Sequence, residues 1–162
     1  MNNNLAYQDD FLEKQRAELI GGEVFLMAPA ATNHVLVSGN IYNIFGNYLK
    51  WKKCVPLMDG VKVFLTEKDH FVPDFMVVCD LGKIKWDGVY GSPDLVVEIL
   101  SPSTAKHDKS YKKEVYAQCG VREYWIVSAA EKSVEQYLLQ DGQFELNAVH
   151  TLYPDYMLNC FF

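Results

Sequence analysis

The sequence predicts an α/β protein of the α+β type, built on one core. Apolar residues recur at helical spacing over 33–50 and 105–119, while the segments between and after them show short apolar runs or alternation. With 162 residues, of which 49% are hydrophobic and 22% charged, the chain has enough apolar surface for one compact core. We therefore expect a single domain over residues 1–162, without an internal repeat or a linker.

The residue pattern of the N-terminal part predicts a β-hairpin. Gly21-Gly22 lies between the apolar run Leu19-Ile20 and the run Glu23 to Met27, and a two-glycine turn between such runs is a hairpin signal. Before the hairpin, Glu13 to Leu19 can form a short helix.

A long helix and two strands are expected to follow. Apolar residues recur every three or four positions from Asn33 to Lys50, and Thr32 or Asn33 can cap this helix. Residues 61–65 alternate between apolar and polar, and the polar break at 67–70 separates them from the apolar run 72–78. This order predicts two strands of a meander.

The second half predicts a buried strand, a helix and a closing hairpin. A glycine-bearing loop over 80–92 leads into the apolar run 93–100, which is typical of a strand buried on both faces. Hydroxyl residues at 101–104 can cap a helix over Ala105 to Cys119, and Gly120 ends it. The remaining strands are expected at 123–127, 134–139 and 144–149, the last two joined by the Asp141-Gly142 turn.

Composition excludes some classes of protein. The apolar runs are strand-sized, far below the roughly 20 residues of a membrane span, and the polar opening segment 1–10 is unlike a secretory signal. We expect a cytoplasmic protein that does not enter a membrane. The net charge of −6 is unfavourable for a protein that binds by wrapping phosphate, so contact with DNA must be local, metal-assisted or oligomeric.

Cysteine spacing favours free thiols. Cys54, Cys79, Cys119 and Cys160 lie far apart and form no C-x-x-C pair. The four histidines show no H-x-x-x-H pair either. The sequence therefore predicts neither a structural zinc nor a disulfide framework.

Two acidic residues in apolar surroundings are the first candidates for a site. Glu98 interrupts the run 95–100, and a buried carboxylate needs a cation, a hydrogen-bond network or a raised pKa. Asp74 lies near the start of its strand, so the two carboxylates meet if their strands are antiparallel neighbours, and together they suit Mg²⁺. The alternatives are a salt bridge to lysine or arginine for Glu98 and a strand-opening Pro-Asp for Asp74. Asp94 repeats the Pro-Asp pattern, and we interpret it as structural.

One lysine stands out in the second helix. Asp108, Lys112, Tyr116 and Cys119 form one stripe at helical spacing, so Lys112 can point into the molecule near Glu98. The alternative is an ordinary i,i+4 ion pair between Asp108 and Lys112 on a solvated face. Competing lysines of the same helix are Lys106, Lys109 and Lys113.

The block Gly91 to Thr104, GSPDLVVEILSPST, resembles the Uma-two type of bacterial restriction endonucleases. The match extends from Glu18 to Val149 and includes the stripe around Lys112 and the segment Gly120 to Val127, GVREYWIV. This family belongs to the PD-(D/E)xK nuclease superfamily. The resemblance implies a restriction-endonuclease-like fold, with a mixed central β-sheet flanked by helices, and Mg²⁺-dependent phosphodiester cleavage.

The resemblance also implies a site. It assigns Mg²⁺, or Mn²⁺, to Asp74, Glu98 and the backbone carbonyl of Ile99, with DNA as the substrate. Leu100 stands where the superfamily usually has lysine, and in this family a helical lysine takes that role, which carries over to Lys112. Secondary candidates for the site are Glu23, His34, Asp108 and Tyr116.

The rival hypothesis is a non-catalytic nuclease-fold module that binds DNA or a protein. The charge and the missing strand lysine favour it, whereas the presence of Asp74, Glu98 and Lys112 in order favours the enzyme. An acidic hydrolase of the PilT type would need clustered aspartates, which the sequence lacks. The aromatic residues Trp51, Trp86 and Tyr90 can form a homodimer face or cover the core.

Overall fold

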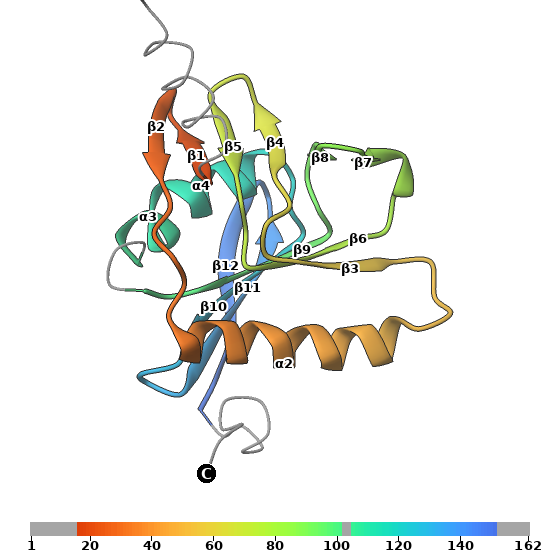
Figure 1. Cartoon of the computed structure of the whole chain (residues 1–162), viewed down its shortest axis with the longest axis vertical. Helices are drawn as coiled ribbons and strands as arrows, with labels where there is room; N and C mark the ends of the chain where they lie inside the picture. Colours follow the sequence, from red (N-terminus) through yellow and green to blue (C-terminus); the bar gives the residue numbers. More distant parts are fainter. Residues whose placement is uncertain (1–15, 102–104, 152–162) are drawn as a thin grey trace, which may run out of the picture.

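The computed structural model describes residues 16–101 and 105–151, which form two six-stranded β-sheets and three α-helices (Figure 1). The helices are α2 (Thr32–Leu49), α3 (Ala105–Lys109) and α4 (Tyr111–Gln118), with a short 3-10 helix η1 (Leu81–Lys83). The central sheet has the order β12 (Gln143–His150), β11 (Ser133–Gln140), β10 (Glu123–Ser128), β9 (Leu95–Ile99), β6 (Phe75–Val78) and β3 (Val55–Met58). The second sheet has the order β2 (Glu23–Leu26), β1 (Ala17–Ile20), β5 (Asp69–Phe71), β4 (Val63–Thr66), β8 (Gly88–Tyr90) and β7 (Ile84–Lys85).

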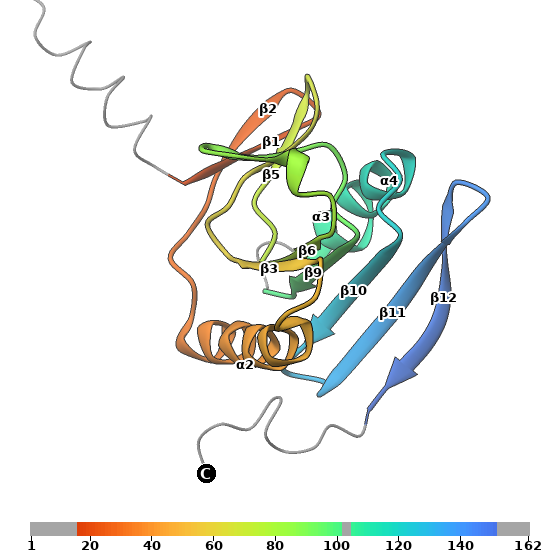
Figure 2. The same cartoon turned by 90° about the vertical axis from the view of Figure 1, so that its right-hand side faces the viewer.

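The central sheet separates two apolar layers. Helix α2 covers one face, and α4 and the second sheet cover the other (Figures 1 and 2). Because side chains alternate along a strand, Phe75 and Val77 pack with α2, while Met76 and Val78 pack towards α4 and the second sheet. The same alternation sends the even-numbered residues of β9 towards α4.

The predicted fold class is confirmed. The central sheet is mixed, since β9 pairs with β10 in parallel and with β6 in antiparallel orientation. All residues of β9 are buried, as its apolar run predicts. The antiparallel register places Phe75 opposite Val97, so the start of β6 lies beside the end of β9. The second sheet was not expected, because its short strands carry little pattern of their own.

The N-terminal hairpin is confirmed, whereas the short helix before it is wrong. Gly21 and Gly22 have φ values of 61° and 87°, which glycine adopts without the steric cost of a side chain. Ala17 to Ile20 form a strand that pairs with β2 and with β5, so tertiary pairing overrides the helical propensity of this segment. Residues 13–15 lie outside the described part of the chain.

Several short strands were not predicted from the sequence. The segment 67–70, expected as a break, contains the start of β5, and the expected loop 80–92 contains η1, β7 and β8. Strand β6 covers only Phe75–Val78 of the expected run 72–78, and residues 72–74 link it to β5, where Pro73 has no N–H for a ladder hydrogen bond. The predicted meander is wrong, because β4 and β6 lie in different sheets. Strand β3 was not predicted at all.

The two helices differ in detail from expectation. Ala31 is the N-cap of α2 and makes no side-chain hydrogen bond, so capping by Thr32 or Asn33 is wrong. The segment 105–119 is two helices that meet at Ser110, whose Oγ donates a hydrogen bond to the carbonyl of Lys106 at 2.6 Å and competes with the helical pattern. Gly120, at φ 86°, follows α4 as expected. The proposed hydroxyl cap falls partly on residues 102–104, outside the described chain.

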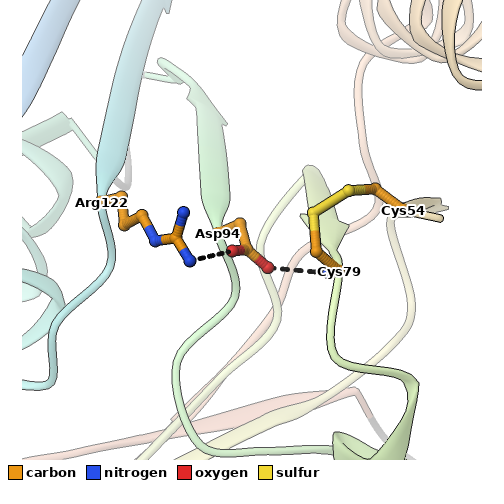
Figure 3. The surroundings of a disulfide bond; sticks show 4 residues. All are labelled: Cys54, Cys79, Asp94 and Arg122. Atoms are coloured by element: carbon orange, nitrogen blue, oxygen red, sulfur yellow. Dashed lines mark hydrogen bonds and ion pairs between the residues drawn. A yellow bond between two sulfur atoms is a disulfide. The ribbon is translucent and has the colours of Figure 1, made fainter. Parts of the chain in front are cut away.

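A disulfide joins Cys54 to Cys79, which corrects the prediction of free thiols (Figure 3). The register of β3 and β6 pairs Val55 with Val78, so the next position in each direction brings the two cysteines face to face. Cys119 is free, and Cys160 lies outside the described residues. The Cys79 amide donates to Asp94 Oδ2 at 2.7 Å, and Arg122 pairs with Asp94 Oδ1 at 3.2 Å, which supports a structural role for Asp94.

The surface carries isolated large side chains. Trp51 and Trp86 are 93% and 97% exposed, so neither covers the core. A homodimer through these rings stays a prediction. No helix in the described part of the chain is long and apolar enough to cross a membrane.

Candidate active site

Glu98 and Lys112 meet inside the molecule. Glu98, the fourth residue of β9, points towards α4 because its neighbours on β9 face α2, and only 3% of it is exposed. The Lys112 Nζ lies 3.3 Å from Glu98 Oε1, and the Tyr116 hydroxyl, one helical turn later, donates to the same oxygen at 2.9 Å. Both of these contacts are made to Oε1, and none of the hydrogen bonds found among the described residues reaches Glu98 Oε2.

Lys112 is held by two further carboxylates. Its Nζ donates to Glu18 Oε1 at 2.9 Å and lies 3.3 Å from Asp108 Oδ1. Both acids are buried, and Glu18 also accepts the backbone N–H of Val72 at 2.8 Å. The i,i+4 pair between Asp108 and Lys112 therefore exists, but it lies in the interior and not on a solvated face.

Asp74 lies at the other side of the site, between β5 and β6. Its Oδ2 accepts the backbone N–H of Ile99 at 2.6 Å, and its Oδ1 lies 3.1 Å from Nε2 of His34 in the first turn of α2. The Ser38 hydroxyl donates to the carbonyl of Asp74 at 3.2 Å. Helix α2 and the end of β9 together fix the position of Asp74.

Burial and crowding of carboxylates shift the pKa values of this cluster. Desolvation raises the pKa of Glu98 well above its ordinary value, and the negative charges of Asp108, Asp74 and Glu18 add to this effect against the opposing charge of Lys112. Burial alone would lower the pKa of Lys112, but the charges of Glu98, Glu18 and Asp108 outweigh it and raise that pKa. Lys112 therefore stays an ammonium ion in the interior.

His34 responds mainly to Asp74. The hydrogen bond to this carboxylate raises the pKa of His34, burial opposes the change, and a backbone hydrogen bond with Ile99 adds a smaller increase. The imidazole thus bridges Asp74 and the end of β9.

A cavity of about 630 Å³ opens above these residues. Glu18, Asp74, Glu98 and Lys112 line it. Residues of β1, β2 and the segment 27–31 that connects β2 to α2 also line it. The site is thus a pocket lined by both buried charged groups and apolar side chains.

Comparison with known proteins identifies the family. The model of the Uma2 family, described as "Putative restriction endonuclease", matches residues 5–159. The chain belongs to the Uma2 family. Its relatives include two uncharacterized proteins of Synechocystis sp.. The protein slr1290 is 28% identical over 80% of this chain and 69% of its own length, and sll1609 is 25% identical over 76% of this chain and 72% of its own length.

The fold of this Uma2 chain also matches a solved structure. The crystal structure of a "putative nuclease belonging to DUF820" from Anabaena variabilis superposes with a TM-score of 0.70 at 17% identity and covers 92% of this chain and 89% of that one. At this identity the likeness shows the fold.

Most of the residues predicted for the Uma2 site come together. Asp74, Glu98, Ile99, Lys112, His34 and the secondary candidate Asp108 line the cavity, and Asp108 contacts Lys112. Tyr116 does not line the cavity but contacts Glu98. Glu23 is exposed at the start of β2, opposite Ile20, and does not line the cavity.

The competing lysines of this Uma2 chain point elsewhere. Lys109 pairs with Glu135 at 3.2 Å, and the Lys113 Nζ lies 3.4 Å from the centre of the Tyr137 ring. The expectation that Lys112 points towards Glu98 is therefore confirmed.

Glu18 is the site residue that sequence reasoning missed. It shares the buried face of β1 with Ile20, two positions later. An assignment of this segment as a strand would have flagged a carboxylate on its apolar face. The expected helix concealed that signal.

Proposed function

We propose that this chain is a metal-dependent endonuclease that hydrolyses phosphodiester bonds of DNA. The observation that carries the proposal is the surplus of carboxylates beside the cavity: Glu18, Glu98 and Asp108 lie within 3.3 Å of the single ammonium group of Lys112, and Asp74 adds a fourth acid. Buried negative charge in such excess favours a hard divalent cation. The Uma2 family description supports nuclease chemistry.

The donor set fits Mg²⁺ or Mn²⁺. None of the hydrogen bonds found among the described residues reaches Glu98 Oε2, and each oxygen of Asp74 keeps a second lone pair beside its present partner. In an extended strand the carbonyl of Ile99 lies on the same edge as its N–H, which points to Asp74. No group of three or more His, Cys, Asp or Glu side chains in the described residues is arranged as a metal site, so water would complete the coordination that these three ligands begin.

The protein side chains then have distinct tasks. A divalent cation supplies charge neutralisation at the phosphate and acidifies water. Tyr116 fixes Oε1 of Glu98 and so orients its other oxygen. Lys112, kept charged by Glu18 and Asp108, presents a positioned ammonium group that orients the attacking water or stabilises charge in the transition state.

The test is nicking of plasmid DNA with Mg²⁺ or Mn²⁺. Glu98→Gln and Lys112→Met should each lower the rate by about 100-fold or more, the size of effect seen when a preorganised charge or donor is removed. Glu23→Gln, an exposed acid outside the cavity, is the matched control and should cleave like the wild type. Circular dichroism must show that every variant is folded.

A second measurement is independent of turnover. A cation that binds only the native state raises the melting temperature, so Mg²⁺ should stabilise the wild type but not Glu98→Gln. If single-stranded, duplex and branched DNA all stay intact and Mg²⁺ shifts no melting curve, the enzyme hypothesis fails. The non-catalytic nuclease-fold module would then remain.

A further inference from the structure

The cavity beside the acidic cluster has apolar lining residues that the proposed chemistry does not use. Ile20, Phe25, Met27 and Pro29 line the same cavity as the carboxylates. A volume of about 630 Å³ falls in the range of roughly 300–1,000 Å³ that holds a small organic molecule. A base that is unpaired and unstacked can enter a cavity of this size, whereas a base inside a duplex cannot.

The charged residues that line the cavity also bear on which form of DNA it suits. Five carboxylates line it against two permanent cations, Arg16 and Lys112. Arg16 Nη1 donates to Asp59 Oδ2 at 3.0 Å, and Lys112 is shared among three acids. Among the described lining residues, each permanent cation therefore already faces a carboxylate. The described lining residues therefore offer few free cations for the several phosphate contacts that duplex binding usually requires.

Two rings from different elements meet at the cavity. Phe25 of β2 is half-buried, and its ring centre lies 5.2 Å from that of His107 in α3. Both residues line the cavity. Aromatic faces of this kind stack on unpaired bases, with little dependence on base identity.

We propose that the cavity binds an unpaired stretch of single-stranded DNA, with a base against the Phe25 and His107 rings and the neighbouring phosphate directed to the cation that Asp74 and Glu98 would hold. The proposal rests on the proposed nuclease function and adds its substrate class. Affinity comes from stacking and apolar contact, since the cavity offers little free positive charge. Val24, on the same strand, is 69% exposed and does not line the cavity, so it provides a matched control.

The experiment measures fluorescence anisotropy of a labelled 12-nucleotide DNA strand, its duplex and the RNA strand of the same sequence, with EDTA and with Mg²⁺. The wild type should bind the single DNA strand at least about tenfold more tightly than the duplex. Phe25→Ala should weaken single-strand binding by about tenfold, the effect of losing one stacked base. Phe25→Tyr, which keeps the ring, and Val24→Ala should bind like the wild type, and melting curves check that each variant is folded.

Tighter binding of the duplex, tighter binding of the RNA strand, or equal losses for Phe25→Ala and Val24→Ala would overturn the proposal. Its failure is separable from that of the nuclease function. Cleavage of duplex DNA without a preference for single strands rejects the substrate class and keeps the enzyme. Ring-dependent binding of the single strand without cleavage rejects the enzyme and keeps the binding site.

Discussion

At the scale of single residues, Lys112 supplies the positive charge that offsets the buried carboxylates around it. It is 3% exposed and faces three carboxylates that are themselves buried. An ammonium ion in this position offsets repulsion among acids that the protein cannot hydrate. Glu98 plays the opposite part, because its charge adds to a site that already has an excess of negative charge.

Removal of these two charges should therefore have opposite effects on stability. Lys112→Met keeps the side-chain volume but removes the cation that three buried acids face. We expect the free energy of unfolding to fall by about 3–5 kcal/mol. Glu98→Gln keeps an oxygen for the Tyr116 hydroxyl and removes a repelling charge, so the metal-free protein should melt at a higher temperature than the wild type. Urea unfolding in EDTA measures both. Equal destabilisation by the two substitutions would show that the cluster is balanced by charge that the described residues do not contain.

The raised pKa of Glu98 also predicts a dependence of stability on pH. At a pH between its ordinary value and its raised value, the folded chain holds a proton that the unfolded chain has released. The contribution of Glu98 to stability consequently falls as pH rises through this window. The stability difference between Glu98→Gln and the wild type, measured in EDTA, should grow from acid to neutral pH. A difference that shrinks over that range would contradict the assignment.

At the scale of elements, β6 and β9 bring the site together. Their antiparallel register pairs Phe75 with Val97, so the next position brings Asp74 beside Glu98, and the Ile99 N–H donates to the Asp74 carboxylate at 2.6 Å. At the other end of β6, the disulfide between Cys54 and Cys79 ties this strand to β3. The proposed catalytic site and the disulfide therefore lie at opposite ends of β6.

This separation predicts that loss of the disulfide lowers stability and spares the site. The bridge spans 25 residues, and loop-closure entropy gives a stabilisation of about 3 kcal/mol. The double variant with Cys54→Ser and Cys79→Ser should lose stability on this order in urea unfolding. Its nicking rate at a temperature where it is folded should equal that of the wild type. A large fall in rate with intact folding would mean that the bridge positions Asp74.

At the scale of the whole molecule, the charge of −6 and the acid-rich cavity set the manner of DNA binding. Arg16 and Lys112 are both engaged by acids, so few cationic side chains of the cavity can neutralise phosphates and release their counterions. Binding should therefore depend only weakly on salt. For single-stranded DNA we expect a slope of log K against log salt of about −1, which corresponds to one or two phosphate contacts. Anisotropy titrations over a range of KCl concentrations measure it, and a steep slope would indicate a basic surface outside the cavity.

The sequence by itself determined the fold class, the buried strand β9, helix α2 and the hairpins, because apolar periodicity and glycine turns are local signals. It also singled out Asp74, Glu98 and Lys112, since a charged residue in an apolar pattern is visible without coordinates. Only the tertiary structure decided which lysine meets Glu98. The break at Ser110 and the packing of α4 on the sheet select Lys112 and turn Lys109 towards Glu135.

The tertiary structure likewise decided which residues that are far apart in the sequence come together in space. Glu18 reaches Lys112, 94 residues away, only because β1 pairs with β5 in the second sheet. Cys54 faces Cys79 through the register of β3, a strand with no clear pattern of its own. Local sequence carries propensity and periodicity, whereas strand pairing and the pooling of charge at one point depend on contacts that close long loops.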